Sequence, residues 1–196
     1  MRDASRQGRY AARMQRGILV KRALDRAAVW HKDQRRKYPG ADVPYVSHVA
    51  GVTVILARHG FDEDVVAAGA LHDVMEDCGV TYEELTSLFG ARVADLVRHV
   101  SEPDKSLSWE ERKRRYVEHF ATKPWDAQAI SLADKIDNFR SIVVCKLDHG
   151  DPWPQFKRGR DAQLERFDAF AAAARALPAH ALIDEFLDEL EAVRAL

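Results

Sequence analysis

Apolar residues along this chain recur mostly at steps of three and four, the spacing that marks one face of an α-helix. The first such segment runs from Ile18 to Lys37 and precedes the helix-breaking letters YPGADVP. No run alternates for long enough to form a sheet, so the pattern predicts an all-α bundle of about eight helices. The later helical segments cover residues 46–59, 62–77, 91–100, 109–120, 125–147, about 160–176 and 179–195.

Residues that start or stop helices support these boundaries. Gly60 directly follows the segment 46–59, in the position of a C-terminal stop. Thr81 and Glu84 have the T-x-x-E spacing of a capping box, which predicts a short helix after Gly79. Gly90 then ends that short helix.

The length of 196 residues fits one domain, which we place at residues 18–196. Residues 1–17 are rich in arginine and form an N-terminal extension, for which a frayed or helical terminus is favoured over a transit peptide or a phosphate-binding arm. The 30 basic and 31 acidic residues nearly cancel, so the overall charge gives no reason to expect nucleic acid as a partner. The sequence leaves the oligomeric state open.

The lack of a membrane-spanning segment and the spacing of the cysteines predict the cellular location of the protein. No run approaches the roughly 18 apolar residues that a membrane helix needs, so no membrane association is expected. Cys78 and Cys145 lack a metal-type spacing and are expected to be reduced thiols, which is typical of a cytoplasmic protein.

The segment AAGALHDVMEDC, residues 67–78, places four ionisable residues on an otherwise apolar helix. Burying charge is costly unless the charge is paired or bound to a metal. At about 100° per residue, His72 lies beside Glu76 and Asp73 beside Asp77, so all four point into one sector. The segment therefore predicts a site at which these side chains converge.

A divalent metal explains the pattern best. His72 and Asp73 are adjacent nitrogen and oxygen donors, which suit manganese, iron, magnesium or zinc. His48 in PYVSH and Asp134 in LADKIDN are polar residues on apolar helices and are the natural remote ligands. Glu76 and Asp77, one turn beyond, are predicted to orient or deprotonate the attacking water, with support of the ligands as the alternative role.

The chain resembles the hydrolase domains of the RelA/SpoT homologues, especially the stand-alone small alarmone hydrolases. The likeness extends over more than half of the chain. It is carried, in the same order, by QRRK (34–37), PYVSH (44–48), AAGALHDVMED (67–77), TYEELTSLFGARVADLV (81–97) and LADKIDN (132–138).

The resemblance implies an all-helical HD domain that uses one Mn²⁺ per chain to remove the 3′-pyrophosphate of ppGpp and pppGpp, leaving GDP or GTP. It makes His48, His72, Asp73 and Asp134 the metal ligands, with Glu76 and Asp77 serving the water. It also places Arg36 and Lys37 in the nucleotide pocket and Asn138 at the sugar.

Local basic residues independently favour a phosphate-rich small molecule. Arg36 and Lys37 precede His48, while Lys105 and Arg112, the latter in the run ERKRR, follow the HD segment and are candidates for the distal phosphates. Two alternatives stay open at this point: an HD phosphatase of another nucleotide, such as NADPH or (p)ppApp, and a module that senses alarmone without cleaving it. Intact Glu76 and Asp77 argue against the sensor.

Overall fold

The computed structural model describes residues 17–101 and 108–196. All the elements of regular secondary structure in these ranges are helices. This confirms the predicted all-α class, with one isolated β-bridge between Arg35 and Pro44. The elements in chain order are α2 (Ile18–Trp30), α3 (Val46–Arg58), α4 (Glu63–Leu71), α5 (Val74–Asp77), α6 (Tyr82–Phe89), α7 (Ala91–Val100), α8 (Trp109–Phe120), α9 (Trp125–Asp148), the 3₁₀ turn η1 (Trp153–Gln155), α10 (Gly159–Arg175) and α11 (Ala181–Arg194).

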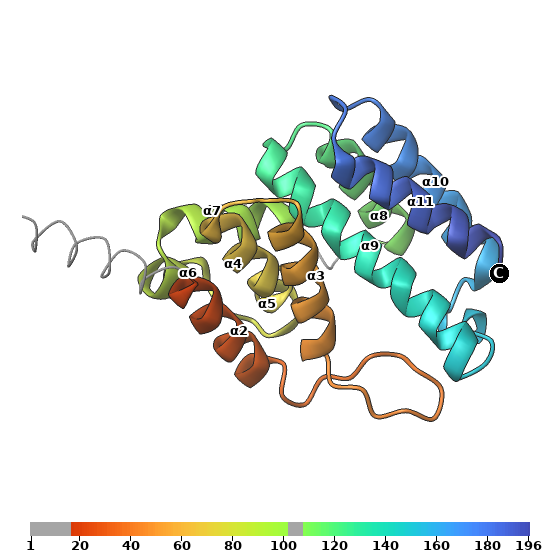
Figure 1. Ribbon diagram of the computed structural model, residues 1–196, viewed down its shortest axis with the longest axis horizontal. Coiled ribbons are helices and arrows are strands. Elements are labelled where there is room, and N and C mark those ends of the chain that lie inside the picture. The colour runs from red at the N-terminus through yellow and green to blue at the C-terminus, as the bar shows by residue number, and fades with distance from the viewer. Residues whose placement is uncertain (1–16, 102–107) are drawn as a thin grey trace, which may run out of the picture.

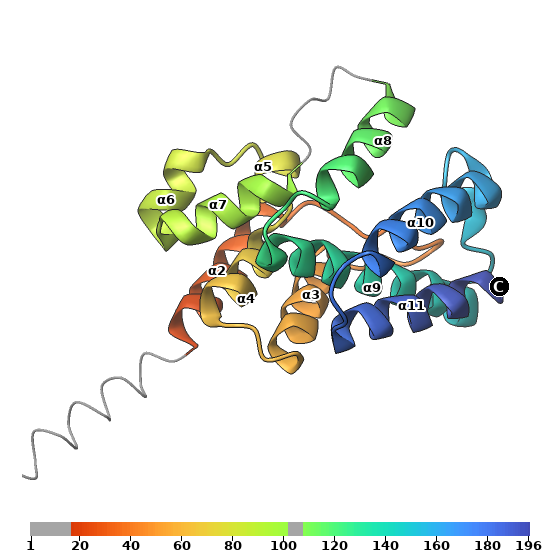
Figure 2. The ribbon, with the colours of Figure 1, turned by 90° about the horizontal axis from the view of Figure 1, so that it is seen from above.

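Helix α9 is the central element of the bundle. It contacts α3, α4 and α7 on one side and α11 on the other (Figure 1). Viewed from above, α8 stands apart from the N-terminal helices and packs beside α10 (Figure 2). Every element that will supply a candidate ligand therefore borders α9 or belongs to it.

Small and aromatic side chains explain how α9 holds the centre. Its first half buries Ala127, Ala129 and Ala133 completely, which lets neighbouring helices approach closely. Further along, the ring of Phe139 packs against Phe167 of α10 and Phe186 of α11, with ring centroids 4.8 and 5.5 Å apart. These rings join the C-terminal helices to the core.

Helix starts follow the capping residues in the sequence. The hydroxyl of Thr81 accepts a hydrogen bond from the Glu84 backbone N–H at 3.1 Å, as predicted from the T-x-x-E spacing. The Asp62 carboxylate accepts from the backbone of residues 64 and 65 at the start of α4. Gly60 follows α3 with a φ of +77°, where a residue with a side chain would be strained.

The first helix is shorter than predicted. It ends at Trp30 rather than Lys37, because the chain from Gln34 to Tyr45 folds back on itself as a loop. Backbone hydrogen bonds from Arg36 N to Val43 O and from Tyr45 N to Gln34 O, 2.8 and 3.0 Å long, hold that loop. Arg36 and Lys37 thus lie on a loop and not on a helix.

The predicted helix 62–77 is also divided in two. Helix α4 ends at Leu71, and α5 begins at Val74. His72 and Asp73 lie in the turn between them, where the backbone of Asp73 has φ −99° and ψ −5°. The ionisable pair therefore occupies an interruption of the helix and not its regular surface.

The other structural expectations concern single features. None of the helices in the described ranges is long and apolar enough to cross a membrane. Cys78 and Cys145 are both free thiols. The predicted extension, apart from Gly17, and Lys105 lie outside the described residues.

Candidate metal centre

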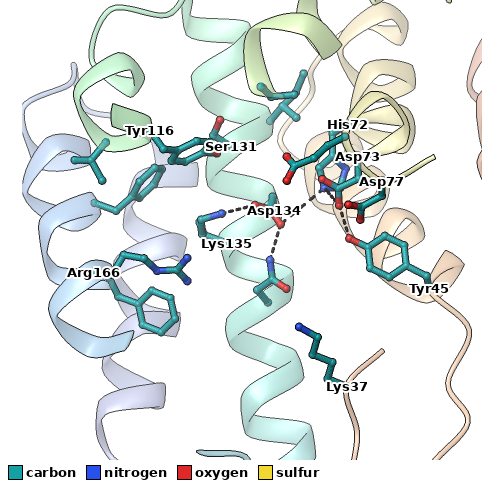
Figure 3. A pocket seen from close by; sticks show the side chains of 17 residues that line it. Lys37, Tyr45, His72, Asp73, Asp77, Tyr116, Ser131, Asp134, Lys135 and Arg166 are labelled. Atoms are coloured by element: carbon teal, nitrogen blue, oxygen red, sulfur yellow. Dashed lines mark hydrogen bonds and ion pairs between the residues drawn. The ribbon is translucent and has the colours of Figure 1, made fainter. Parts of the chain in front are cut away.

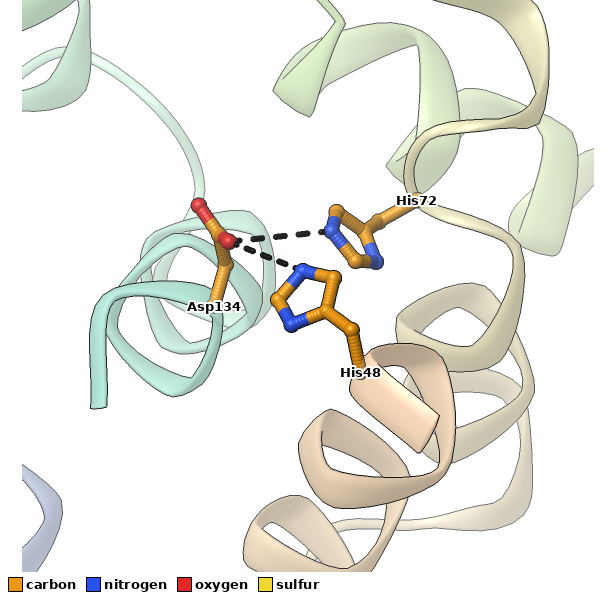
Figure 4. Close-up of side chains that lie close together, drawn as sticks. All are labelled: His48, His72 and Asp134. Atoms are coloured by element: carbon orange, nitrogen blue, oxygen red, sulfur yellow. Dashed lines mark ion pairs between the residues drawn. The ribbon is translucent and has the colours of Figure 1, made fainter. Parts of the chain in front are cut away.

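Three elements bring together two imidazoles and a carboxylate. His48 comes from α3, His72 from the turn after α4 and Asp134 from α9, and one donor atom from each lies within 4.8 Å of the others (Figure 4). The two histidines are only 1% and 5% exposed. Sequence analysis predicted these three residues as ligands, and the fold places them at one point.

A close approach of α3 and α4 accounts for the meeting of the histidines. Gly69 of α4 has no side chain at this contact, where a Cβ would fall 2.3 Å from Leu56 Cδ1 of α3. One turn later the imidazole of His72 packs edge-to-face on that of His48, with ring centroids 5.1 Å apart. Glycine in mid-helix is thus explained by helix packing beside the site.

The ring of His72 presents a nitrogen that fits a cation. Its Nδ1 lies 2.8 Å from the Gly69 carbonyl oxygen, which can only accept, so Nε2 carries the lone pair of the neutral ring. That nitrogen faces Asp73 Oδ2 at 2.9 Å and Asp134 Oδ1 at 3.8 Å. Within residues 17–101 and 108–196 it makes no hydrogen bond of good geometry. A lone pair held against two carboxylates requires a positive charge between them.

The pKa values of the same groups agree with this reading. Burial lowers the pKa of His72, but the charges of Asp73 and Asp134 outweigh it and raise that pKa to about 9. Burial raises the pKa of the Asp134 carboxyl, yet Lys135 and the two histidines hold it well below its usual range. The centre therefore favours a cation, which is either a proton on His72 or a divalent metal.

The fourth predicted ligand, Asp73, borders this group. Its Oδ2 lies 3.8 Å from His48 Nε2 as well as 2.9 Å from His72 Nε2. The same oxygen accepts a hydrogen bond from the hydroxyl of Tyr45. Burial and the negative charge of Asp73 raise the pKa of Tyr45, which keeps this hydroxyl a donor. Sequence analysis missed Tyr45, although it stands three residues before His48 in the motif PYVSH.

Both oxygens of Asp134 are held from its own helix. Lys135 Nζ lies 2.5 Å from Oδ2, and Asn138 Nδ2 donates to Oδ1 at 2.5 Å. Arg36 reaches over from its loop and donates to Asn138 Oδ1 at 3.0 Å. The predicted sugar contact, Asn138, thus already connects the metal centre with the predicted nucleotide contact.

The centre opens into a cavity of about 350 Å³ (Figure 3). Glu76 and Asp77 line it beside His72 and Asp73, so the predicted convergence of these four side chains is observed despite the break in the helix. Gln34 Nε2 donates to Asp77 Oδ2 at 2.8 Å and orients that carboxylate. The wall opposite the acids includes Tyr116, Lys135 and Arg166, which sequence analysis did not select.

A second cavity of about 340 Å³ adjoins the first and shares residues Lys37 and Asn138 with it. Arg36 and Tyr38 line only the second one. Cavities of these sizes are in the range that small-molecule ligands occupy. The loop 34–45 therefore forms part of a site next to the metal centre, as the position of QRRK suggested.

Neither of the residues predicted to contact the distal phosphates, Lys105 and Arg112, is found in the described lining of the two cavities. Lys105 lies outside the described residues, and Arg112 of α8 is absent from the described lining of both cavities. Its neighbours Arg114 and Arg115 pair with Glu111 on the same helix, at 2.7 Å each. Arg114 and Arg115 thus belong to an ion-paired helix surface, and a substrate contact by Arg112 stays a prediction.

Comparison with known proteins adds independent information. A family model described as the HD domain matches residues 23–177. A protein of Drosophila melanogaster named guanosine-3′,5′-bis(diphosphate) 3′-pyrophosphohydrolase MESH1 is 46% identical over 123 residues, 62% of this chain and 68% of the fly protein. The MESH1 of Danio rerio is 44% identical over 121 residues, 61% of this chain and 66% of its own. A solved structure described as a metazoan ortholog of SpoT that hydrolyzes ppGpp superposes with a TM-score of 0.77 at 35% identity, covering 89% of this chain and 94% of that one.

Proposed function

Since this chain belongs to the HD-domain family, we propose that it is a metal-dependent hydrolase that removes the 3′-pyrophosphate of ppGpp or pppGpp, giving GDP or GTP. The observation that carries the proposal is the group His48, His72 and Asp134, which opens into a cavity lined by three further carboxylates, those of Asp73, Glu76 and Asp77. The resemblance seen in the motifs is confirmed by the family match and by relatives named for this reaction.

We propose one divalent ion per chain, bound by His48, His72, Asp73 and Asp134, and Mn²⁺ as the ion used. Two imidazoles and two carboxylates form a mixed shell that suits a borderline to hard cation. When bound, such an ion lowers the pKa of water and stabilises negative charge on phosphate oxygens. The chain's part is to hold the ligand atoms in place from three different helices or turns.

Glu76 and Asp77 are proposed to handle the protons of the reaction. The oxygen of water attacks the phosphorus joined to O3′, the P–O3′ bond breaks, and pyrophosphate leaves. A carboxylate of this pair takes the proton from water, and the carboxylic acid so formed returns it to O3′, which becomes the free hydroxyl. Asp77 is suited to this work because Gln34 fixes its Oδ2 while the side chain still lines the cavity.

The second cavity is proposed to hold the nucleoside. Arg36 and Lys37 lie along it, and Asn138 stands between it and the metal centre. In the proposed arrangement the 3′ substituent of the nucleotide extends into the first cavity, which Asp134 lines.

Residues 18–196 are proposed as the hydrolase domain, with residues 1–17 as an extension. Free thiols at Cys78 and Cys145 support the proposal that the protein is cytoplasmic.

Substrate preference is the direct test of the proposal. We expect a higher kcat/KM for ppGpp than for NADPH, ppApp or GTP in the presence of Mn²⁺, because specificity is the ratio of these constants. Products are separated by chromatography after incubation of the full chain with equal concentrations of each nucleotide. Preference for NADPH or ppApp would instead identify the protein as a phosphatase of that nucleotide. If the metal-bound protein hydrolysed none of these nucleotides, a module that senses alarmone would be favoured.

Arg36→Gln is expected to weaken nucleotide binding more than turnover. The guanidinium lines the second cavity, and a charged hydrogen bond contributes about 1.5–3 kcal/mol, which corresponds to a rise in KM of roughly 10- to 100-fold. Steady-state kinetics with ppGpp give kcat and KM separately. Arg114→Gln, on the ion-paired surface of α8, is the matched control. An unchanged KM together with a large fall in kcat would instead assign Arg36 to support of Asn138.

A further inference from the structure

A third carboxylate of α9 contacts the metal centre from behind. Asp137 Oδ2 lies 2.6 Å from His48 Nδ1, on the side of the ring away from the proposed ligand atom Nε2. Both side chains are sheltered, at 16% exposure for Asp137 and 1% for His48. Asp137 is neither a proposed metal ligand nor a proposed substrate contact.

A glycine makes room for this carboxylate. Gly51 lies one turn after His48 on α3, and a Cβ there would fall 1.8 Å from Asp137 Oδ1 and 2.7 Å from its Cγ. Glycine within a helix costs about 0.5–1 kcal/mol relative to alanine. The position therefore has a reason other than backbone freedom: α3 lacks a side chain where the Asp137 carboxylate sits.

The pairing determines what His48 offers to the centre. An ionised carboxylate only accepts hydrogen bonds, so the ring hydrogen of neutral His48 is on Nδ1 and the lone pair is on Nε2. Nε2 lies 3.2 Å from Asp134 Oδ1, within the proposed ligand group. A carboxylate behind a metal-binding imidazole also increases the basicity of the ligand nitrogen.

We propose that Asp137 is a positioning residue that fixes the tautomer and orientation of His48, and that Gly51 is the space this arrangement requires. The inference rests on the proposed metal-dependent function. One turn of α9, from Asp134 to Asn138, then has two roles. Asp134 supplies a ligand, and Asp137 orients another ligand, His48, which lies on α3.

The test is metal affinity of the full chain, measured on protein stripped of metal by titration with Mn²⁺ and detection of the free ion by electron paramagnetic resonance. Asp137→Asn and Asp137→Ala are expected to bind Mn²⁺ about 10- to 100-fold more weakly, the range found when such outer partners are removed. Gly51→Ala is expected to weaken binding as well, because its methyl group displaces the carboxylate. Asp148→Asn, an exposed carboxylate at the end of the same helix, is the matched control and should bind as wild type does.

A second measurement needs no variant. In the metal-free wild-type protein with a neutral His48 ring, the ¹⁵N chemical shifts of His48 are expected to show hydrogen on Nδ1. Hydrogen on Nε2, or Mn²⁺ affinities of the Asp137 variants equal to wild type, would overturn the proposal. Wild type that binds no Mn²⁺ would overturn it together with the proposed metal. Wild type that binds Mn²⁺ but leaves ppGpp intact would refute the proposed substrate alone, and weaker binding by the Asp137 variants would still support the inference.

Discussion

His72→Ala is expected to abolish both metal binding and hydrolysis. The imidazole is 5% exposed, and its Nε2 lies within 4 Å of Asp73 Oδ2 and Asp134 Oδ1, so the substitution removes a donor atom from the middle of the centre. The loss of rate should exceed the roughly 10²- to 10⁴-fold typical of removing one acid–base group, because the chemistry that the ion supplies is lost entirely. Elemental analysis of purified protein and turnover of ppGpp with Mn²⁺ measure the two effects.

The control for this variant is His99→Ala, an exposed histidine on α7, which should keep one ion per chain and full activity. Thermal unfolding of both variants separates loss of the ion from loss of the fold. Activity that survives in His72→Ala, or in wild type treated with a chelator, would refute the central proposal that hydrolysis depends on this metal centre.

Asp77→Asn and Glu76→Gln are expected to keep the metal and lose about 10²- to 10⁴-fold in kcat, the contribution usual for general acid–base catalysis. Each substitution preserves shape and removes the group that accepts a proton. In Asp77→Asn the amide oxygen of the new side chain can still accept the hydrogen bond from Gln34, so the position of the side chain is retained. Single-turnover kinetics with ppGpp, together with metal content, distinguish loss of proton transfer from loss of the ion.

The matched control is Asp33→Asn. It removes an exposed carboxylate next to the loop 34–45 and should leave the rate of ppGpp turnover unchanged. If both Asp77→Asn and Glu76→Gln turned over ppGpp at nearly the wild-type rate, the pair would have only a supporting role beside the ligands. A large effect in one variant alone would identify which carboxylate moves the proton.

The sequence by itself determined the helical class, most helix boundaries and the candidate donors of the proposed metal centre. These features depend on interactions within a few residues: the three- and four-residue spacing of apolar side chains, the Thr81 cap, and the stops at Gly60 and Gly90. His72 and Asp134 were recognisable as candidate donors because charge on an apolar helix needs a partner. That reasoning requires no knowledge of where the helices lie in space.

Only the tertiary structure decided which side chains hydrogen-bond to those donor residues and where the first helix ends. The loop 34–45 replaces the end of the predicted helix because its hydrogen bonds close across the loop itself, and the turn at His72 and Asp73 interrupts a segment whose periodicity continues unbroken. His48 and Asp137 are 89 residues apart in sequence, yet their side chains are in contact. No local pattern encodes such a pair. It exists because α3 and α9 pack closely at Gly51, and the choice of neighbours across a helix interface depends on the whole core.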